Sequence, residues 1–408
     1  MVYLGFLISH HLAAQDINAP YSIIGIGDIE NNLYNRSSGM ANTGISLRSG
    51  KSLYQANPAS YSALDNQFFN FELGAQGEVV KYAGTTVDPL NNSNSDFSIK
   101  KAAAGFKINK RWGTGVGLIP FSSVSYLFTV QKSIDGTNNS YQAKYDGNGG
   151  LNEIYWANGY QISKHFSIGI NSSLLFGSIK QTELIQEETS ASNITSTKNI
   201  YIHDFHFDYG LQYFTALNKK YDLNMGFVFS NKTSLKSQYS LLVTNYDGTT
   251  VKDEVLKDDN YTFPLSYGAG ISVTKNKRLT LAADYKFQDW SSVKTEYKNY
   301  VTSSHRFSMG IQYSKLRNIS NYLYEKNYVQ AGLFFNNSYV NINNHQISDY
   351  GITLGGGVPV SGRINVNMAL EIGTRGTTQN ALIKENYTQL TINISYRDIW
   401  YTKGRKFE

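Results

Sequence analysis

The chain has 408 residues, of which 41% are hydrophobic and only 17% are charged; Tyr is abundant (31) and Pro is scarce (6). Because cysteine is absent, a disulfide framework, a thiolate metal site and a thiol nucleophile are all excluded. The net charge of +6 does not indicate nucleic-acid binding, since the basic residues form no tracts. This composition favours strands over helices, and no Pro/Gly/Ser-rich linker divides the chain.

The N-terminal residues 1–15 are apolar and end in small residues before Asp16. We expect a signal peptide cleaved near Ala14 or Gln15, truncated at its start because no Lys or Arg precedes Arg36. A buried N-terminal strand is the alternative. Beyond this stretch no run of eighteen apolar residues exists, so the sequence predicts no transmembrane helix.

One short stretch before the strands has a helical pattern. Asn57 suits a helix cap, Pro58 suits the first helical position, and Ala59 to Leu64 continue the pattern. It belongs to the segment 16–67, which is otherwise irregular and rich in small residues.

Strict alternation of apolar and polar residues dominates the rest of the chain. It is clearest in 205–213, 279–288, 364–372 and 390–397. Runs of about nine or ten residues with period two match tilted strands that cross a bilayer. We predict about fourteen strands, an even number as in bacterial outer-membrane barrels. The predicted spans are 68–82, 96–109, 112–132, 140–162, 165–185, 199–217, 221–242, 261–275, 278–298, 305–315, 327–340, 345–359, 362–375 and 387–398.

The connections between these strands alternate in character. One set is short and basic, as in 109–111, 218–220 and 275–277; the other is longer and polar, as in 186–198 and 243–260. Short turns at one end and long loops at the other are typical of membrane barrels, with the turns in the periplasm. The connection 316–326 is too long for the short class and is expected to hold a short helical turn.

The sequence thus predicts an all-β fold, a roughly 14-stranded antiparallel transmembrane β-barrel in a Gram-negative type outer membrane. The expected division is a signal peptide at 1–15, an N-terminal plug (hatch) at 16–67 and the barrel at 68–408. A soluble β-sandwich is the alternative. Aromatic residues near the strand ends suit interfacial girdles: Tyr82, Trp112, Trp156, Tyr221, Trp290 and Trp400.

The plug is predicted because a barrel of this size has a lumen too wide for wall side chains to fill. The segment 16–67 is long enough to fold inside it, and the helical piece that starts at Asn57 is interpreted as part of the plug. Small residues such as Gly44 and Ala56 would let it pack closely against the wall.

Several collinear motifs resemble the FadL/TodX family of long-chain fatty-acid and hydrocarbon transporters. "RSSGMANTGISLRSGKSLYQANPASYSALD" resembles the family's hatch, with "GM" followed by Asn-Pro-Ala. The stretch 115–121 resembles its third-strand "G-x-G…P-F" segment, and 263–293 resembles its proline-entered hairpin. The resemblance implies a fourteen-stranded barrel that takes up small hydrophobic molecules passively and releases them sideways into the membrane. It also implies plug and gating roles for Gly39, Met40, Asn57, Pro58 and Ala59.

The lateral exit of that family is placed where the third strand kinks. Pro120 lies in the middle of the predicted strand 112–132 and has no N–H to donate, so strand pairing should break there. We therefore expect a lateral gate at Pro120 and Phe121. A proline at a strand bulge without any transport role is the alternative.

Charged side chains at inward positions of the strands are expected to hydrogen-bond to the plug or to one another. These predicted lumen residues are Asp208, Asp284, Lys286, Glu371 and Arg397. Lys286 or Arg397 is also a candidate for holding a fatty-acid carboxylate.

The chain departs from the fatty-acid transporters in its loops. The loop 186–198 is polar and has no amphipathic helix that could capture a hydrophobic ligand. This favours an alternative function, a non-transporting barrel subunit of an outer-membrane protein secretion or assembly machine whose loops dock a partner. The expected partners are outer-membrane lipid, a small hydrophobic ligand or detergent in the lumen and, in the alternative, other outer-membrane or surface proteins. The sequence does not identify a ligand.

No catalytic, metal or cofactor site is predicted. His203 and His206 are three residues apart and point to opposite faces of a strand, so they cannot share an ion. Gly355–Gly357 lacks the helix that follows a phosphate-binding loop, and no Ser-His-Asp set stands out. The chain is therefore predicted not to be an enzyme.

Overall fold

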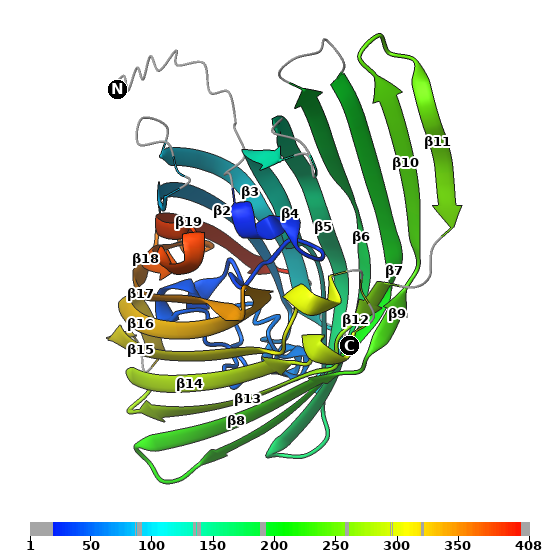
Figure 1. Ribbon diagram of the computed structural model, residues 1–408. Helices are drawn as coiled ribbons and strands as arrows, with labels where there is room; N and C mark the ends of the chain where they lie inside the picture. Colours follow the sequence, from blue (N-terminus) through cyan, green and yellow to red (C-terminus); the bar gives the residue numbers. More distant parts are fainter. Residues whose placement is uncertain are drawn as a thin grey trace, which may run out of the picture.

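A computed structural model of the chain describes residues 19–85, 87, 92–133, 136, 140–187, 193–257, 261–293, 295, 297–319 and 322–400. The expected signal peptide at 1–15 lies outside these residues. The described part is mostly β-structure arranged as a ring (Figure 1).

Fourteen antiparallel strands form the wall of the ring. In chain order they are β2 (Phe68–Ala83), β3 (Ser93–Lys107), β4 (Trp112–Ser133), β5 (Ser140–Gln161), β6 (Phe166–Glu187), β7 (Asn193–Ala216), β8 (Tyr221–Ser230), β13 (Ser266–Lys275), β14 (Leu279–Gln288), β15 (Ser304–Ile319), β16 (Tyr322–Ile342), β17 (His345–Pro359), β18 (Ile364–Arg375) and β19 (Lys384–Ile399). The last strand pairs with the first along its whole length, from Lys384↔Ala83 to Ile399↔Phe68. The predicted closed fourteen-stranded barrel is confirmed, and the β-sandwich alternative is wrong.

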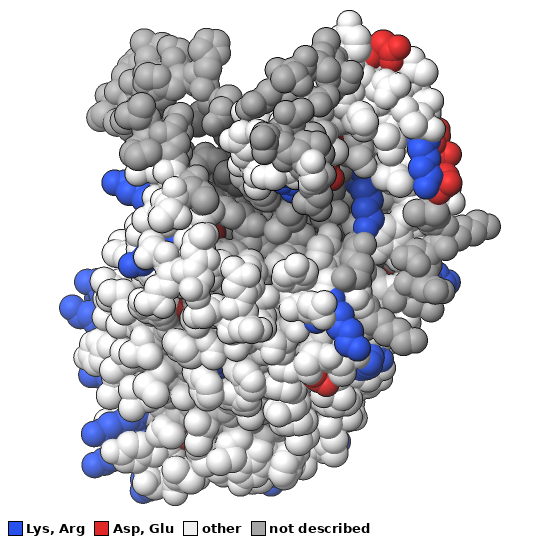
Figure 2. Space-filling model, viewed as in Figure 1, with Lys and Arg blue, Asp and Glu red and all other residues white. Residues whose placement is uncertain are grey.

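Alternation in the sequence becomes an outer and an inner face of the wall. Ile352 is 55% exposed and lies between Leu333 and Ile372, its register partners on the neighbouring strands, which are similarly exposed. Figure 2 shows a wall almost free of charged atoms, with Lys and Arg gathered at its lower left rim. Among the described residues, no helix is long and apolar enough to cross a membrane.

The wall differs from the predicted strands between 221 and 260. β8 ends at Ser230, and two further strands follow, β10 (Ser237–Asn245) and β11 (Thr250–Lys257). Short strands β9 (Thr233–Leu235) and β12 (Tyr261–Phe263) pair only with each other in the described residues. The single predicted strand 221–242 and the predicted loop 243–260 are therefore wrong. The alternation along β7 does not reveal that its pairing partner changes from β8 to β10.

Two local expectations also fail. β14 ends at Gln288, and the one-turn helices η4 (Trp290–Ser292) and η5 (Lys298–Tyr300) replace the rest of the predicted strand 278–298. The connection 316–326 has no helical turn in its described residues, because β15 and β16 extend to Ile319 and from Tyr322.

Two of the predicted girdle aromatics lie inside the barrel. Trp290 is 1% exposed and stacks on Tyr339 with ring centroids 4.5 Å apart, and Tyr82 is 9% exposed. Trp112, Trp156 and Trp400 are exposed. A strand-end position therefore does not determine which way an aromatic side chain points.

The N-terminal segment, residues 19–67, lies inside the ring (Figure 1). It contains η1 (Pro20–Ile23), β1 (Asp28–Ile29), η2 (Arg36–Met40) and η3 (Pro58–Ala63), and a further turn, η6 (Gln379–Ala381), joins β18 to β19. The expected helical start is present as a 3₁₀-helix, in which Asn57 accepts a hydrogen bond from the Ala59 N–H.

Candidate functional site

The interior of the ring, where the N-terminal segment meets the wall, contains most of the predicted site residues. η3 packs against a row of glycines that are register neighbours across β4, β5, β6 and β7: Gly113, Gly159, Gly169 and Gly210. A Cβ built on Gly159 would lie 2.7 Å from the Pro58 carbonyl oxygen, and one on Gly169 would overlap the Ala59 backbone. Only glycine permits so close an approach of the segment to the wall.

Asn57 ties η3 to both the segment and the wall. Its Nδ2 donates to the carbonyl oxygens of Ile45 (2.9 Å) and Leu211 (3.1 Å), while its Oδ1 caps η3. Asn57 and Ala59 are fully buried, and Pro58 packs on Gly210. These three predicted residues are therefore adjacent at one contact with the wall.

The predicted residues Gly39 and Met40 contact the opposite side of the barrel. Thr353 on β17 donates to the Gly39 carbonyl (3.0 Å) and accepts from the Ala41 N–H (2.9 Å). Met40 is fully buried and packs over Gly310 on β15. The segment is thus anchored to both sides of the ring.

Ion pairs reinforce this attachment. The Arg36 guanidinium donates two hydrogen bonds to Glu325 (2.7 and 2.6 Å), and Arg375 makes a similar paired contact with Asp28. Burial is the largest influence and lowers the pKa of Arg36, but the hydrogen bond and charge of Glu325 together with nearby tyrosines raise it above its ordinary value. The guanidinium is therefore permanently charged.

The predicted lumen charges occupy different environments. Asp284 accepts hydrogen bonds from the backbone N–H groups of Gly44 (2.6 Å) and Ile45 (2.8 Å), and Arg397 pairs with Asp65 of the segment. The Asp208 Oδ1 lies 3.0 Å from the His206 Nε2, and Glu371 accepts a hydrogen bond from the Tyr387 hydroxyl. These four side chains therefore contact either the segment or other residues of the wall.

The β3–β4 ladder breaks beside Pro120. In the described residues β3 pairs with β4 only where Ala102–Lys107 faces Gly113–Leu118, whereas β4 pairs with β5 along its whole length. The β4–β5 register shifts between Pro120 and Ser122, which places Phe121 in a bulge. The β3–β4 ladder therefore ends next to the two residues predicted as a lateral gate.

Beyond Leu118, the N-terminal segment pairs with the edge of β4 that β3 no longer pairs with. β1 pairs with Ser122 and Ser123, and the Glu30 N–H donates to the Phe121 carbonyl (3.0 Å). The Ala19 N–H donates to the Ser125 carbonyl (2.6 Å). The inner side of the ladder break is thus covered by the segment.

Two cavities remain beside the segment. One, of about 200 Å³, borders Pro120 and Phe121 and is lined by apolar side chains together with His206, Asp208, Lys286 and others. The other, of about 230 Å³, lies between the N-terminal segment and the wall, and its lining includes ten charged groups: Asp28, Glu30, Glu78, Asp96, Lys100, Arg306, Asp349, Glu371, Arg375 and Glu385. The second is polar enough to suit water better than hydrocarbon, whereas the first has a mixed, mainly apolar lining.

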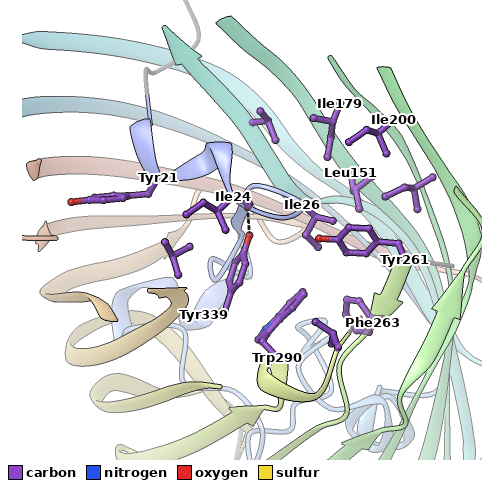
Figure 3. Packing of buried hydrophobic residues seen from close by; sticks show 14 of the residues in the cluster. Tyr21, Ile24, Ile26, Leu151, Ile179, Ile200, Tyr261, Phe263, Trp290 and Tyr339 are labelled. Carbon is purple, nitrogen blue, oxygen red and sulfur yellow. Dashed lines mark hydrogen bonds between the residues drawn. The ribbon is translucent and has the colours of Figure 1, made fainter. Parts of the chain in front are cut away.

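The largest buried apolar cluster is packed. Residues of η1 and the adjoining chain contact η4, β16 and the upper parts of β5 to β7 (Figure 3). Tyr339 donates to the carbonyl oxygen of Ile24 (2.7 Å) within it. This apolar cluster is therefore filled by the protein's own side chains.

Sequence reasoning missed several of these residues. Lys101 and Glu72 form a buried ion pair (2.7 Å) between neighbouring strands, and Glu72 also accepts from the Leu53 N–H (2.9 Å). Their signal in the sequence was the presence of charged residues and glycines at strand positions that point into the barrel. In the described residues, no group of three His, Asp or Glu is arranged to hold a metal ion.

Comparisons with known proteins agree with this architecture. A family model described as BamG matches residues 1–408. The Pseudomonas aeruginosa FadL homologue is 12% identical, with 90% of this chain and 98% of that one covered and a TM-score of 0.58. The P. putida toluene transporter TodX is 16% identical, with 93% and 99% covered and a TM-score of 0.58. The Ralstonia pickettii toluene transporter TbuX is 14% identical, with 89% and 97% covered and a TM-score of 0.50.

At these identities the likeness shows the fold, a FadL-type barrel. Among curated proteins, the sequence comparison finds no match.

Proposed function

The chain belongs to the BamG family, and from this membership and the packed interior we propose that it is a barrel subunit of an outer-membrane protein assembly machine. The family name favours this role over a free-standing transporter. The apolar outer wall and the FadL-type fold support a location in the outer membrane of a Gram-negative type cell.

The observation that carries the proposal is the character of the interior. Passive uptake of a hydrophobic molecule needs a continuous apolar path, because desolvating a buried charge beside hydrocarbon is costly. The lining of the cavity of about 230 Å³ instead includes seven carboxylates and three basic side chains. The apolar cluster above it is filled by Ile24, Trp290 and Tyr339 among others.

The segment's anchors support a static role. Arg36, Arg375 and Arg397 each pair with a carboxylate across the boundary between segment and wall. All three arginine side chains are largely buried, so displacing the segment would break three charged contacts together and leave these charges without a partner. This favours a barrel that is held shut and serves as a scaffold.

Uptake of small hydrophobic molecules is the second candidate. One observation favours it: the cavity of about 200 Å³ includes Ile119, Pro120 and Phe121 at the bulge of β4. In this candidate function the ladder break acts as the lateral gate, and the segment 16–67 acts as the regulated plug.

The two functions are separated by gentle extraction of the tagged chain from native membranes. We expect a stable complex with at least one other protein at a fixed stoichiometry, and an unrelated tagged porin processed in parallel should not bring it down. Recovery of a free monomer would contradict the subunit proposal.

Uptake by cells that lack the chain provides the complementary measurement. The subunit proposal predicts unchanged initial rates for toluene and a radiolabelled fatty acid, once rates are normalised to the amounts of the other outer-membrane transporters. A selective loss that wild-type chain restores and Phe121→Asp does not restore would favour transport.

A further inference from the structure

The hairpin of β10 and β11 leaves the barrel wall and stands beside it. The lower half of β7 pairs with β8 from Asp208 to Ala216, whereas its upper half pairs with β10 from Ile194 to Ile202. β8 continues around the ring to β13, and β10 continues to β11 instead. In Figure 1 the two strands rise at the right-hand edge of the view, with β11 outermost.

This hairpin lies above the apolar belt of the wall. The outward side chains of β7 are apolar and exposed from Phe205 to Leu211. Farther up the same face they become Tyr201, Asn199 and Thr197, which pair with β10. The hairpin therefore extends into water at the end of the barrel that carries the long connections.

The hairpin turn is well defined. The Asn245 N–H donates to the Thr249 carbonyl (2.9 Å), and the Thr249 N–H donates to the Asp247 carboxylate (3.0 Å). Hydrogen bonds from Thr249 hold the pKa of Asp247 below its ordinary value. Gly248 supplies the positive φ of 82° that the turn requires. The outer strand is thus presented in a fixed extended form.

The outer edge of β11 is open. In the part of the chain that the structure describes, β11 pairs with β10 alone. Val251 and Val255 are each 59% exposed, and Tyr246 at the turn is 70% exposed. An open edge with exposed apolar side chains in water is a template for strand addition.

We propose that β11 binds an extended segment of another protein as an added antiparallel strand. By strand alternation Asp253 and Val255 share one face, and on the other face Lys252 and Glu254 pair with each other (3.1 Å). The β10–β11 register shifts between Val243 and Thr244, which places Val251 in a bulge at the end of this face. The complementary segment therefore carries an apolar residue opposite Val255 and a Lys or Arg opposite Asp253. Its recognition combines backbone hydrogen bonds with an apolar-x-basic pattern.

A second copy of this chain does not fit the edge. β11 rises along the barrel together with β7 and β10 (Figure 1). Antiparallel pairing of two such strands would orient the two barrels in opposite directions. Barrels inserted by one route into one membrane share a single orientation, so the partner is a different protein. This inference deepens the proposed function, because it names the surface through which the subunit binds its partner.

The experiment is site-specific photocrosslinking in native membranes with benzoylphenylalanine at position 255. We expect one major protein adduct, mapped to an extended segment with the apolar-x-basic pattern. Asp253→Lys should reduce the adduct at least about tenfold, which corresponds to about 1.4 kcal/mol of binding. Benzoylphenylalanine at position 360 is the control, because Val360 is similarly exposed (67%) at a short turn of the opposite rim.

The charge variant Val251→Asp/Val255→Asp separates the two proposals, with Val360→Asp as its matched control. If gentle extraction still recovers the stoichiometric complex with the double variant, the edge is not the docking site, although the subunit proposal stands. If wild-type chain yields no complex at all, the proposed function fails. Adducts to lipid, to a second copy or to a helical segment would overturn the strand-addition proposal. Heat-modifiable migration on a gel verifies that each variant is folded.

Discussion

At the scale of single residues, the buried Lys101–Glu72 pair shows how the wall tolerates charge. Both side chains are at most 1% exposed, and Lys101 also donates to Gln55 of the N-terminal segment (3.0 Å). Two charges removed from water stabilise a fold only when each remains fully paired. The pair therefore specifies how β2, β3 and the segment fit together.

Removing the charge of Lys101 alone should destabilise the barrel more than removing the charges of both Lys101 and Glu72. We expect Lys101→Met to destabilise the folded barrel by about 3–5 kcal/mol, because it leaves Glu72 buried without a cation. Lys101→Met/Glu72→Gln should recover most of this loss. Urea unfolding in detergent, followed by heat-modifiable gel migration, measures both. Equal stability of the single and double variants would show that the pair is not coupled.

At the scale of elements, the glycine row explains why η3 can lie flat on the wall. Gly159 and Gly169 are register partners, and each would carry a Cβ into the backbone of η3. The short 3₁₀-helix has few contacts of its own to hold it, so its position depends on these close approaches and on the Asn57 hydrogen bonds.

A side chain in the row should therefore displace the segment without opening the barrel. We expect Gly169→Val to leave the gel shift of the folded barrel intact, while protease cleavage within residues 19–67 becomes at least about tenfold faster. A tenfold increase follows if the substitution makes the docked position of the segment less favourable by about 1.4 kcal/mol. Gly362→Val is the control, because a Cβ at Gly362 meets no atom within 4 Å. Unchanged cleavage in Gly169→Val would mean that the wall yields instead of the segment.

At the scale of the whole molecule, the apolar outer face of the wall favours contact with membrane lipid over contact with water. Ile352, Leu333 and Ile372 belong to one exposed layer that continues around the ring. A closed ring leaves few unpaired backbone groups for lipid to cover. The ladder break above Leu118 is the exception, and the N-terminal segment partly satisfies it.

A charge on this face should be costly in proportion to its depth. We expect Ile352→Arg to make folding into bilayers less favourable by about 2–4 kcal/mol. Val360→Arg at the rim should make folding less favourable by at most about 1 kcal/mol. Folding into lipid vesicles from urea measures the difference. A similar small cost at both positions would place Ile352 outside the hydrocarbon.

The sequence by itself determined the barrel, its fourteen strands and its inward and outward faces. The physical reason is that a period of two is imposed on every strand by lipid on one side and a polar interior on the other. It also located the residues around Asn57 and Pro120, since capping and the missing proline N–H act locally.

Only the tertiary structure decided what fills the lumen and what leaves the wall. Partners such as Arg375 and Asp28 are 347 positions apart, and the switch of β7 from β8 to β10 changes pairing without changing alternation. Contacts of that kind depend on which strands become neighbours in space, and no local pattern records them.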